Sequence, residues 1–233
     1  MDEFIKKVVD KVCNKLKKDD NIVGIILYGS IAKGNYHRYS DIDLYVVKSN
    51  VKNKTTVFFE DDIPVQIIWR SMESFKTKII KRTRGIPIGL VGEILYDPSG
   101  LISKYMKKSK LQAAEGPIEL SEQEKLIIRA ILSQDLKTVE GLVENDEIAG
   151  ATILANEILL QALSGYYDLK KWWFPSNKHI ISDLKFREKQ IGELAEQIIL
   201  CSNINEKIEK LSKLTDIVLS EMGGAIEEYE IIW

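Results

Sequence analysis

Two apolar runs on either side of a glycine-serine turn constrain this chain most strongly. Residues 22–28 read IVGIILY, and residues 40–47 read SDIDLYVV. Such runs are typical of β-strands, and the first has no polar alternation, so we expect it to be buried on both faces of a sheet. The intervening GSIAKGN predicts a glycine-bounded turn that opens a short helix. The N-terminal part of the chain is therefore built on a sheet.

Two aspartates, Asp41 and Asp43, lie one residue apart on the second run. Side chains alternate along a strand, so both aspartates share a face with Tyr45, while Ile42 and Leu44 take the other. Two carboxylates this close repel each other, and burying either without a partner is costly. A divalent cation removes that cost. Mg²⁺ is the natural candidate because proteins bind it through a few carboxylates together with substrate phosphates.

The turn supplies the other half of such a site. Gly29 lets the backbone approach a phosphate closely, and exposed N–H groups and the Ser30 hydroxyl can donate to its oxygens. Lys33 follows one turn later, within reach of the same phosphates. A Gly-Ser pair or an Asp-x-Asp alone is usually an ordinary turn or strand end. Joined in this order between two apolar strands, they favour a site for magnesium and a nucleoside triphosphate.

The succession of strand, YGS, turn and SDIDLYVV resembles the signature of the DNA polymerase beta-like nucleotidyltransferase superfamily. The layout is most similar to the small-molecule branch, the kanamycin nucleotidyltransferase-like enzymes. The resemblance implies that Asp41 and Asp43 are catalytic and hold one or two Mg²⁺ ions. It also implies that Gly29, Ser30 and Lys33 help these aspartates to bind the nucleotide.

The resemblance implies a reaction as well. A hydroxyl of a small-molecule acceptor, such as an aminoglycoside-like compound, attacks the α-phosphorus of the nucleoside triphosphate. The acceptor takes a nucleoside monophosphate, AMP if the nucleotide is ATP, and pyrophosphate leaves. The kanamycin nucleotidyltransferase-like enzymes build their cleft between two chains, so a homodimer is also an expectation.

The family's third carboxylate is replaced here. It normally comes from the next strand, where the matching run is IPVQIIWRS, residues 63–71. Alternation puts Gln66 at the position of the expected acid, so we count it among the substrate-binding residues. A glutamine amide brings no charge and cannot act as a base.

Three explanations for this replacement stay open. The helical part of the chain supplies the missing carboxylate, with Asp135 and Glu157 as our catalytic candidates beside Glu140. Alternatively, an acid of the hairpin turn at residues 60–62 moves in. In the third, the protein binds nucleotide with weak or no turnover and acts as a regulator.

After Gly100 the sequence pattern changes from mixed strands and helices to helices. Before it, we expect a helix at 3–18, a hairpin at 55–69 and helices at 72–82 and 87–95. After it, the pattern predicts helices at 121–144, 147–168, 186–201 and 204–222. We therefore predict an α+β protein with a small mixed-sheet nucleotidyltransferase domain at 1–100. A C-terminal four-helix bundle at 101–233 follows as the acceptor-binding domain.

An aromatic stretch, WWFPSNKH, interrupts the helical part. It resembles an aromatic-Pro-x-x-Lys element of the family's helical domains, so Trp173 and Lys178 are candidates for binding substrate. The alternative is that its aromatic residues close the end of the bundle. Arg82 and Arg84, in the first domain, offer either a phosphate contact or a solvated basic face.

Composition bounds the location and the partners. The formal net charge of −2 argues against a general nucleic-acid binder. Cys13 and Cys201 are far apart, and no zinc site of usual spacing can be written with His37 and His179. The charged N-terminal stretch lacks a signal-peptide pattern, and no apolar run suggests a membrane span. We expect a cytoplasmic protein.

Overall fold

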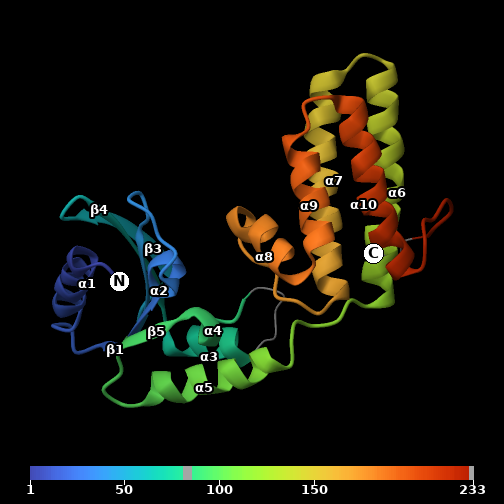
Figure 1. The fold of residues 1–233 in the computed structure, drawn as a ribbon. Helices are drawn as coiled ribbons and strands as arrows, with labels where there is room; N and C mark the ends of the chain where they lie inside the picture. The colour runs from blue at the N-terminus through green and yellow to red at the C-terminus, as the bar shows by residue number, and fades with distance from the viewer. Residues whose placement is uncertain (81–85, 231–233) are drawn as a thin grey trace. The chain divides into compact units, whose positions relative to one another are not determined.

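The chain packs as two compact units, Met1–Gly116 and Pro117–Trp233. The structure is a computed structural model (Figure 1), and it describes residues 1–80 and 86–230. Arg82 and Arg84 lie outside the described residues, as does the end of the helix predicted at 72–82.

A five-stranded sheet forms the centre of unit 1, in the order β3-β4-β2-β1-β5. Its strands are β1 (Ile22–Tyr28), β2 (Ile42–Lys48), β3 (Lys54–Glu60), β4 (Ile63–Arg70) and β5 (Glu93–Tyr96). β2 and β4 run parallel, and the other neighbouring pairs are antiparallel. The mixed sheet expected from the sequence is therefore confirmed.

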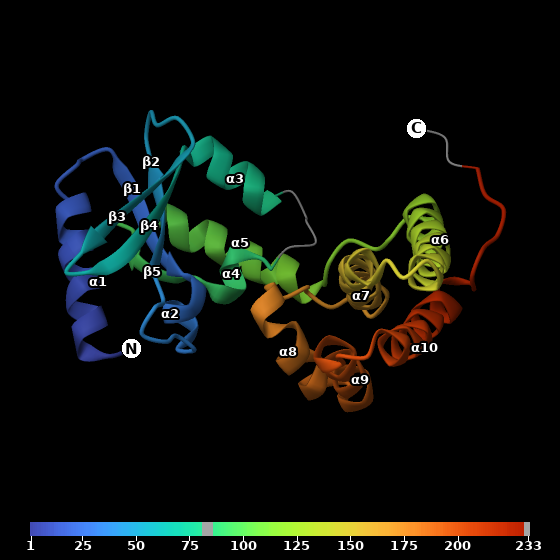
Figure 2. The ribbon, with the colours of Figure 1, turned by 90° about the horizontal axis from the view of Figure 1, so that it is seen from above.

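Helices cover both faces of this sheet (Figure 2). On one face, α1 (Glu3–Leu16) packs its valines against Ile42, Leu44 and Val46 of β2. On the other face, α3 (Met72–Ile80) and α5 (Leu101–Ala114) cover Tyr45. β1 contributes buried residues to both layers, as its unbroken apolar run predicts.

The hairpin and the short helix form where the sequence predicts them. β3 and β4 are joined through Asp61 and Asp62, whose φ angles of 50° and 63° are the left-handed values that tight hairpins favour. α2 (Gly29–Lys33) opens directly after β1. Aspartate tolerates the left-handed region better than most residues, which explains its presence at both turn positions.

The helix predicted at 87–95 is wrong. Only α4 (Ile88–Val91) is helical there, and the chain then extends into β5, which pairs with β1. Gly92, between the two, packs closely against β1, because a Cβ there would lie 2.8 Å from the Ile26 side chain. The apolar run is shared between a helical turn and a strand, so its spacing resembles one continuous helix.

The division between the units falls after Gly116, whereas the sequence suggests one after Gly100. The intervening helix, α5, was not predicted, and it belongs to unit 1. Its buried residues Ile102, Met106, Ser109 and Ala113 recur at helical spacing. Ile102 and Met106 pack in the layer beneath the sheet, which ties α5 to the first unit.

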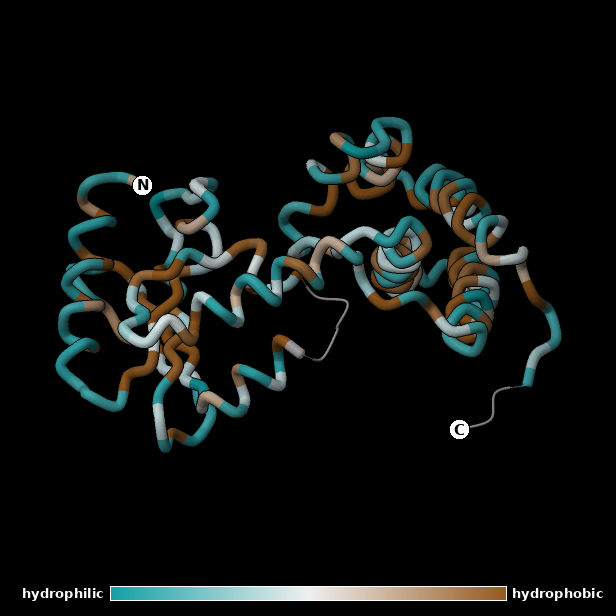
Figure 3. The backbone as a smooth tube through the Cα atoms, turned by 90° about the horizontal axis from the view of Figure 1, so that it is seen from below, coloured by the Kyte–Doolittle hydropathy of each residue, from teal (hydrophilic) through white to brown (hydrophobic). Residues whose placement is uncertain are grey.

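Unit 2 is helical, and its four long helices match the predicted bundle. They are α6 (Glu122–Glu144), α7 (Ile148–Leu169), α9 (Lys189–Leu200) and α10 (Ile204–Met222). They share one core, and Figure 3 shows hydrophobic residues along these helices as well as in the strands of unit 1. The predicted interruption holds a 3₁₀ turn (Asn177–His179) and α8 (Ile180–Arg187).

Within the part of the chain that the structure describes, one helix, α7, is long and apolar enough to cross a membrane. Its apolar residues instead include Ala155, Ile158, Leu159 and Leu163, all buried in the core of unit 2. Core helices of this kind meet the same criterion of length and composition.

Candidate active site

The turn after β1 brings backbone and carboxylate unusually close together. Gly29 has a φ of +77°, a conformation that side chains disfavour. A Cβ at this position would lie 2.1 Å from Oδ2 of Asp43. Glycine is therefore required here twice, by the backbone conformation and by the space that the Asp43 carboxylate occupies.

The strand register places the polar residues of three strands in one row. Asp43 pairs with Tyr28 of β1 on one side and with Gln66 of β4 on the other. Asp41 precedes β2 by one residue and follows the same alternation. The expectation that Asp43 and Tyr45 share a face, opposite Ile42 and Leu44, is confirmed by the two separate cores.

Gln66 lies directly beside Asp43. Its Nε2 donates to Asp43 Oδ1 at 3.2 Å and makes a longer contact of 3.5 Å with the Tyr28 hydroxyl. The amide therefore acts as a donor that supports the carboxylate. The strand position is the one expected from the sequence, but the parallel pairing that creates the contact was not foreseen.

The pKa of Tyr28 reflects the burial and the charges of this row of polar residues. Burial raises the pKa of its hydroxyl to about 12, and the negative charge of Asp43, with that of Asp41, adds to the shift. The hydrogen bond from Gln66 opposes it. The Tyr28 phenol thus stays protonated at neutral pH. Its place opposite Asp43 is a site feature that the sequence reading missed, although it is the last strand residue before Gly29.

The donor set fits a magnesium ion that is completed by phosphates. Two carboxylates and a protein amide are hard oxygen-bearing groups of the kind Mg²⁺ takes, usually alongside substrate phosphates and water. Among residues 1–80 and 86–230, no group of three or more His, Cys, Asp or Glu residues could hold a metal ion. Asp41 and Asp43 alone would therefore not enclose a metal ion, and substrate phosphates and water would have to complete its coordination.

The acids of the hairpin turn are engaged elsewhere. Lys11 of α1 pairs with Glu60 and with Asp61 at 2.7 Å each, and Lys15 also contacts Glu60. Glu60 is buried against these lysines. Because α1 covers the opposite face of the sheet from Asp43, these pairs hold both acids away from Gln66. The explanation in which a hairpin acid replaces the third carboxylate loses its support.

Asp135 and Glu157 lie near each other in unit 2, on α6 and α7. Burial raises the pKa of Asp135, and the negative charge of Glu157 raises it further. A raised carboxyl pKa suits a general base better than an ordinary one does. This proximity is an observation within unit 2, and the catalytic role of the two acids stays a prediction.

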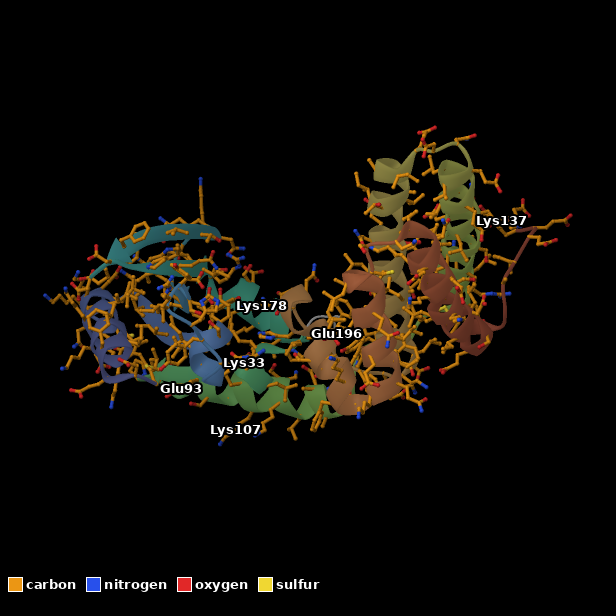
Figure 4. The ribbon with its side chains drawn as sticks, turned by 45° about the horizontal axis from the view of Figure 1, so that its top comes forward. Lys33, Glu93, Lys107, Lys137, Lys178 and Glu196 are labelled. Atoms are coloured by element: carbon orange, nitrogen blue, oxygen red, sulfur yellow. The ribbon has the colours of Figure 1, made fainter. Side chains whose placement is uncertain are left out.

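The remaining predicted residues are spread over both units. Lys33 is exposed at the end of α2 and Lys178 is exposed in the 3₁₀ turn, as Figure 4 shows for each within its own unit. Trp173 is half-buried. Its neighbours Trp172 and Phe174 pack edge-on against Tyr167, which makes them part of the core of unit 2.

Residues 10–96 match the family described as "Polymerase beta, Nucleotidyltransferase". The matched segment contains the Gly29 turn, Asp41 and Asp43, and Gln66. This part of the chain is therefore a nucleotidyltransferase domain of the polymerase beta family. The superfamily expected from the sequence is confirmed, and the small-molecule branch stays a prediction.

A curated relative from Methanocaldococcus jannaschii carries the name "Putative protein adenylyltransferase MJ1305". It is 39% identical over 54 residues, a stretch that covers 23% of this chain and 33% of the relative. The match thus spans about a third of that relative's length.

A solved structure, that of a nucleotidyltransferase-like protein from Exiguobacterium sibiricum 255-15, is also similar. The alignment covers 94% of this chain and 77% of that one, with 11% identity and a TM-score of 0.48. The assignment of the family rests on residues 10–96 and not on this likeness.

Proposed function

We propose that this protein is a magnesium-dependent nucleotidyltransferase that transfers AMP from ATP to an acceptor hydroxyl and releases pyrophosphate. The observation that carries the proposal is the contact between the Gly29 turn and Asp43, where only glycine leaves room for the carboxylate. That contact joins a phosphate-binding turn to a pair of acids. A structural turn has no need to approach a carboxylate so closely.

The residues of unit 1 have distinct parts in this reaction. Backbone N–H groups of the turn and the Ser30 hydroxyl donate to the triphosphate, and Lys33 reaches its outer oxygens. Asp41 and Asp43 hold Mg²⁺, which neutralises charge on the phosphates when it is bound. Gln66 keeps Asp43 oriented through its hydrogen bond.

The transfer itself is an in-line displacement. The acceptor oxygen forms a bond to the α-phosphorus as the bond from that phosphorus to the bridging oxygen breaks, and pyrophosphate leaves with the bonding electrons. The acceptor hydroxyl loses its proton to a base. Gln66 cannot be that base, so Asp135 and Glu157 remain our candidates.

The acceptor is the part of the proposal with two candidates. Our sequence-based candidate is a small hydroxylated molecule such as an aminoglycoside-like compound, for a cytoplasmic enzyme that does not use a nucleic-acid template. The name of the archaeal relative supports a second candidate, a hydroxyl on a protein. Two exposed residues of edge strand β3, Val57, which pairs with Gln66, and Phe59, which pairs with Pro64, also favour a partner with apolar surface.

The test uses ATP labelled separately at the α- and γ-phosphates. The full chain is incubated with Mg²⁺ and either a panel of aminoglycoside-like compounds or a cell extract. We expect the α label, and not the γ label, to appear on the acceptor. Label on a small molecule supports the first candidate and label on a protein band supports the second. Transfer of the γ label would show a kinase reaction and end the proposal.

Gln66 favours one alternative function, a nucleotide-binding regulator with weak or no turnover. The amide occupies the place of the family's third carboxylate and already has a partner in Asp43. A regulator would bind ATP with Mg²⁺ but transfer label to no acceptor in this test. Rapid turnover by the wild-type protein would exclude it.

A further inference from the structure

A cavity lined by polar and charged side chains opens between β2, β4 and α3, on the face of the sheet that carries Asp43 and Tyr45. Its volume is about 430 Å³. Tyr45 of β2 and Arg70 of β4 lie on its sheet side, and Ser71, Ser74 and Lys78 come from the start and the end of α3. None of these residues was predicted from the sequence to bind a ligand.

Tyr45 presents an unsatisfied donor to this cavity. The residue is 1% exposed, and within the described parts of the chain its buried hydroxyl has no hydrogen-bond partner. Leaving a buried hydroxyl unpaired destabilises the protein, and a ligand that accepts its hydrogen bond would remove that penalty.

Two cations face the same space. The Lys78 ammonium lies 5.3 Å from the centroid of the Tyr45 ring, and loss of hydration together with the charge of Arg70 lowers the pKa of Lys78. Arg70 donates to the Trp69 carbonyl at 2.8 Å, which orients its guanidinium. Among the described residues, neither cation forms an ion pair with a carboxylate, although Glu73 lies exposed among the lining residues.

Hydroxyl groups at the start of α3 complete the lining. Ser71 Oγ accepts from the Ser74 backbone N–H at 3.1 Å, and Ser74 Oγ accepts from the Asn53 side chain at 2.6 Å. Each hydroxyl that accepts such a bond still carries a proton to donate. The N-terminal end of a helix also adds positive potential.

We propose that this cavity is a binding site for a phosphate-type oxyanion, distinct from the triphosphate position at Gly29 and Ser30. Such an anion would pair with Arg70 and Lys78 and accept the unused hydrogen bond of Tyr45. A neutral ligand would leave the two cations uncompensated, and a cation would add to their repulsion. The site does not depend on nucleotidyl transfer.

The test is calorimetric titration of inorganic phosphate into the full chain, in a buffer with EDTA. Without metal, phosphate has no cation to bind at Asp41 and Asp43. We expect saturable binding that Lys78→Met weakens about 10-fold or more, since a charged hydrogen bond is lost. The matched control is Lys76→Met on the same helix, because Lys76 lies over the Tyr105 ring instead and does not line the cavity.

Tyr45→Phe separates binding from folding. We expect it to weaken phosphate binding about 3- to 10-fold while leaving the unliganded protein at least as stable, because it removes an unpaired buried hydroxyl. No saturable binding, or equal binding by the Lys78→Met and Lys76→Met proteins, would overturn the proposal. Loss of binding in Ser30→Ala with no loss in Lys78→Met would also overturn it, because the anion would then occupy the triphosphate turn.

A parallel titration with glycerol 3-phosphate identifies the source of the anion. Tighter binding of inorganic phosphate would indicate a free ion. Tighter binding of the ester would indicate the phosphate group of a larger ligand. Either result supports the proposed site, provided that Lys78→Met weakens the binding of the anion.

Discussion

The two units each hold a pair of acids, and the pairs differ in what surrounds them. Asp41 and Asp43 stand on one strand, beside a glycine whose missing side chain makes room for a carboxylate. Asp135 and Glu157 face each other from two helices, and the main cause of the Asp135 pKa shift is burial. Proximity of two acids alone therefore does not define a metal site. The phosphate-binding turn beside the first pair makes the difference.

The largest expected effect comes from removing one charge of the strand pair. Asp43→Asn should lower the rate of pyrophosphate release on the order of 10²-fold or more, because the phosphates lose their metal-bound counter-charge. Release of pyrophosphate from ATP in the presence of an acceptor measures it. Asp62→Asn is the matched control, since Asp62 is exposed in the hairpin turn and asparagine also tolerates its left-handed backbone. Equal loss in both variants would contradict the assignment.

Gly29→Ala tests the close contact between the turn and the Asp43 carboxylate. The substitution meets both a positive φ and the Asp43 carboxylate, so we expect a loss of about 1–3 kcal/mol in the free energy of unfolding, with weaker ATP binding. Gly34→Ala is matched because Gly34 also has a positive φ, of +73°, but nothing lies within 4 Å of its added Cβ. It should cost only about 1 kcal/mol. Urea unfolding measures both variants. An equal loss in the free energy of unfolding would show that the contact between Gly29 and Asp43 is not what requires glycine.

Gln66→Glu adds a third carboxylate to Asp41 and Asp43. It therefore makes this group of acids differ more from the pair in unit 2. Without metal, the new carboxylate faces Asp43 and the pKa of one of them rises. A carboxyl with a raised pKa in the folded state destabilises the fold once it ionises, so the penalty is absent below about pH 4 and grows as the pH rises. Thermal unfolding from pH 3 to pH 7 measures this.

Binding of Mg²⁺ should restore the stability that Gln66→Glu loses at neutral pH. If the regulatory alternative is right, Gln66→Glu should also create or sharply raise pyrophosphate release. A variant with unchanged release and no response to Mg²⁺ would show that position 66 does not belong to the metal site.

The smallest effect concerns the helical pair. Burial is the main cause of the raised pKa of Asp135, and Glu157→Gln removes the negative charge that adds to it, so that pKa should fall part of the way toward its usual value. The fold should gain slightly in stability at neutral pH, where the Asp135 carboxyl is ionised, and not below about pH 4. A carbon-13 NMR titration of the carboxyl measures the pKa. Glu140→Gln, on the same helix α6 as Asp135, is the control and should leave the pKa of Asp135 unchanged.

The sequence predicted what depends on local pattern. The strands around Gly29, the alternation that puts Asp43 and Tyr45 on one face, and the hairpin all follow from short-range spacing. The parallel pairing of β2 with β4 follows from long-range packing, so the hydrogen bond between Gln66 and Asp43 could not be predicted. β5 was missed because four residues beside a helical turn carry too little alternation.

α5 was missed for a different reason. Its apolar positions have helical spacing, but lysines between them resemble a solvated linker. The cavity at Tyr45 had no signal of its own, since its cations come from β4 and α3, which meet only in the folded chain. The cavity, like the contact between Gln66 and Asp43, needs segments that meet only in the folded chain, so neither could be predicted from local pattern.

The most direct measurement is calorimetric titration of ATP, with and without Mg²⁺, into the wild-type protein and the Asp41→Asn, Asp43→Asn double variant. We predict binding to the wild type that requires Mg²⁺ and is lost in the double variant, with the Asp62→Asn protein behaving as the wild type. Equal ATP binding by the wild type and the double variant, or binding indifferent to Mg²⁺, would contradict the assignment of Asp41 and Asp43 as the metal-holding pair.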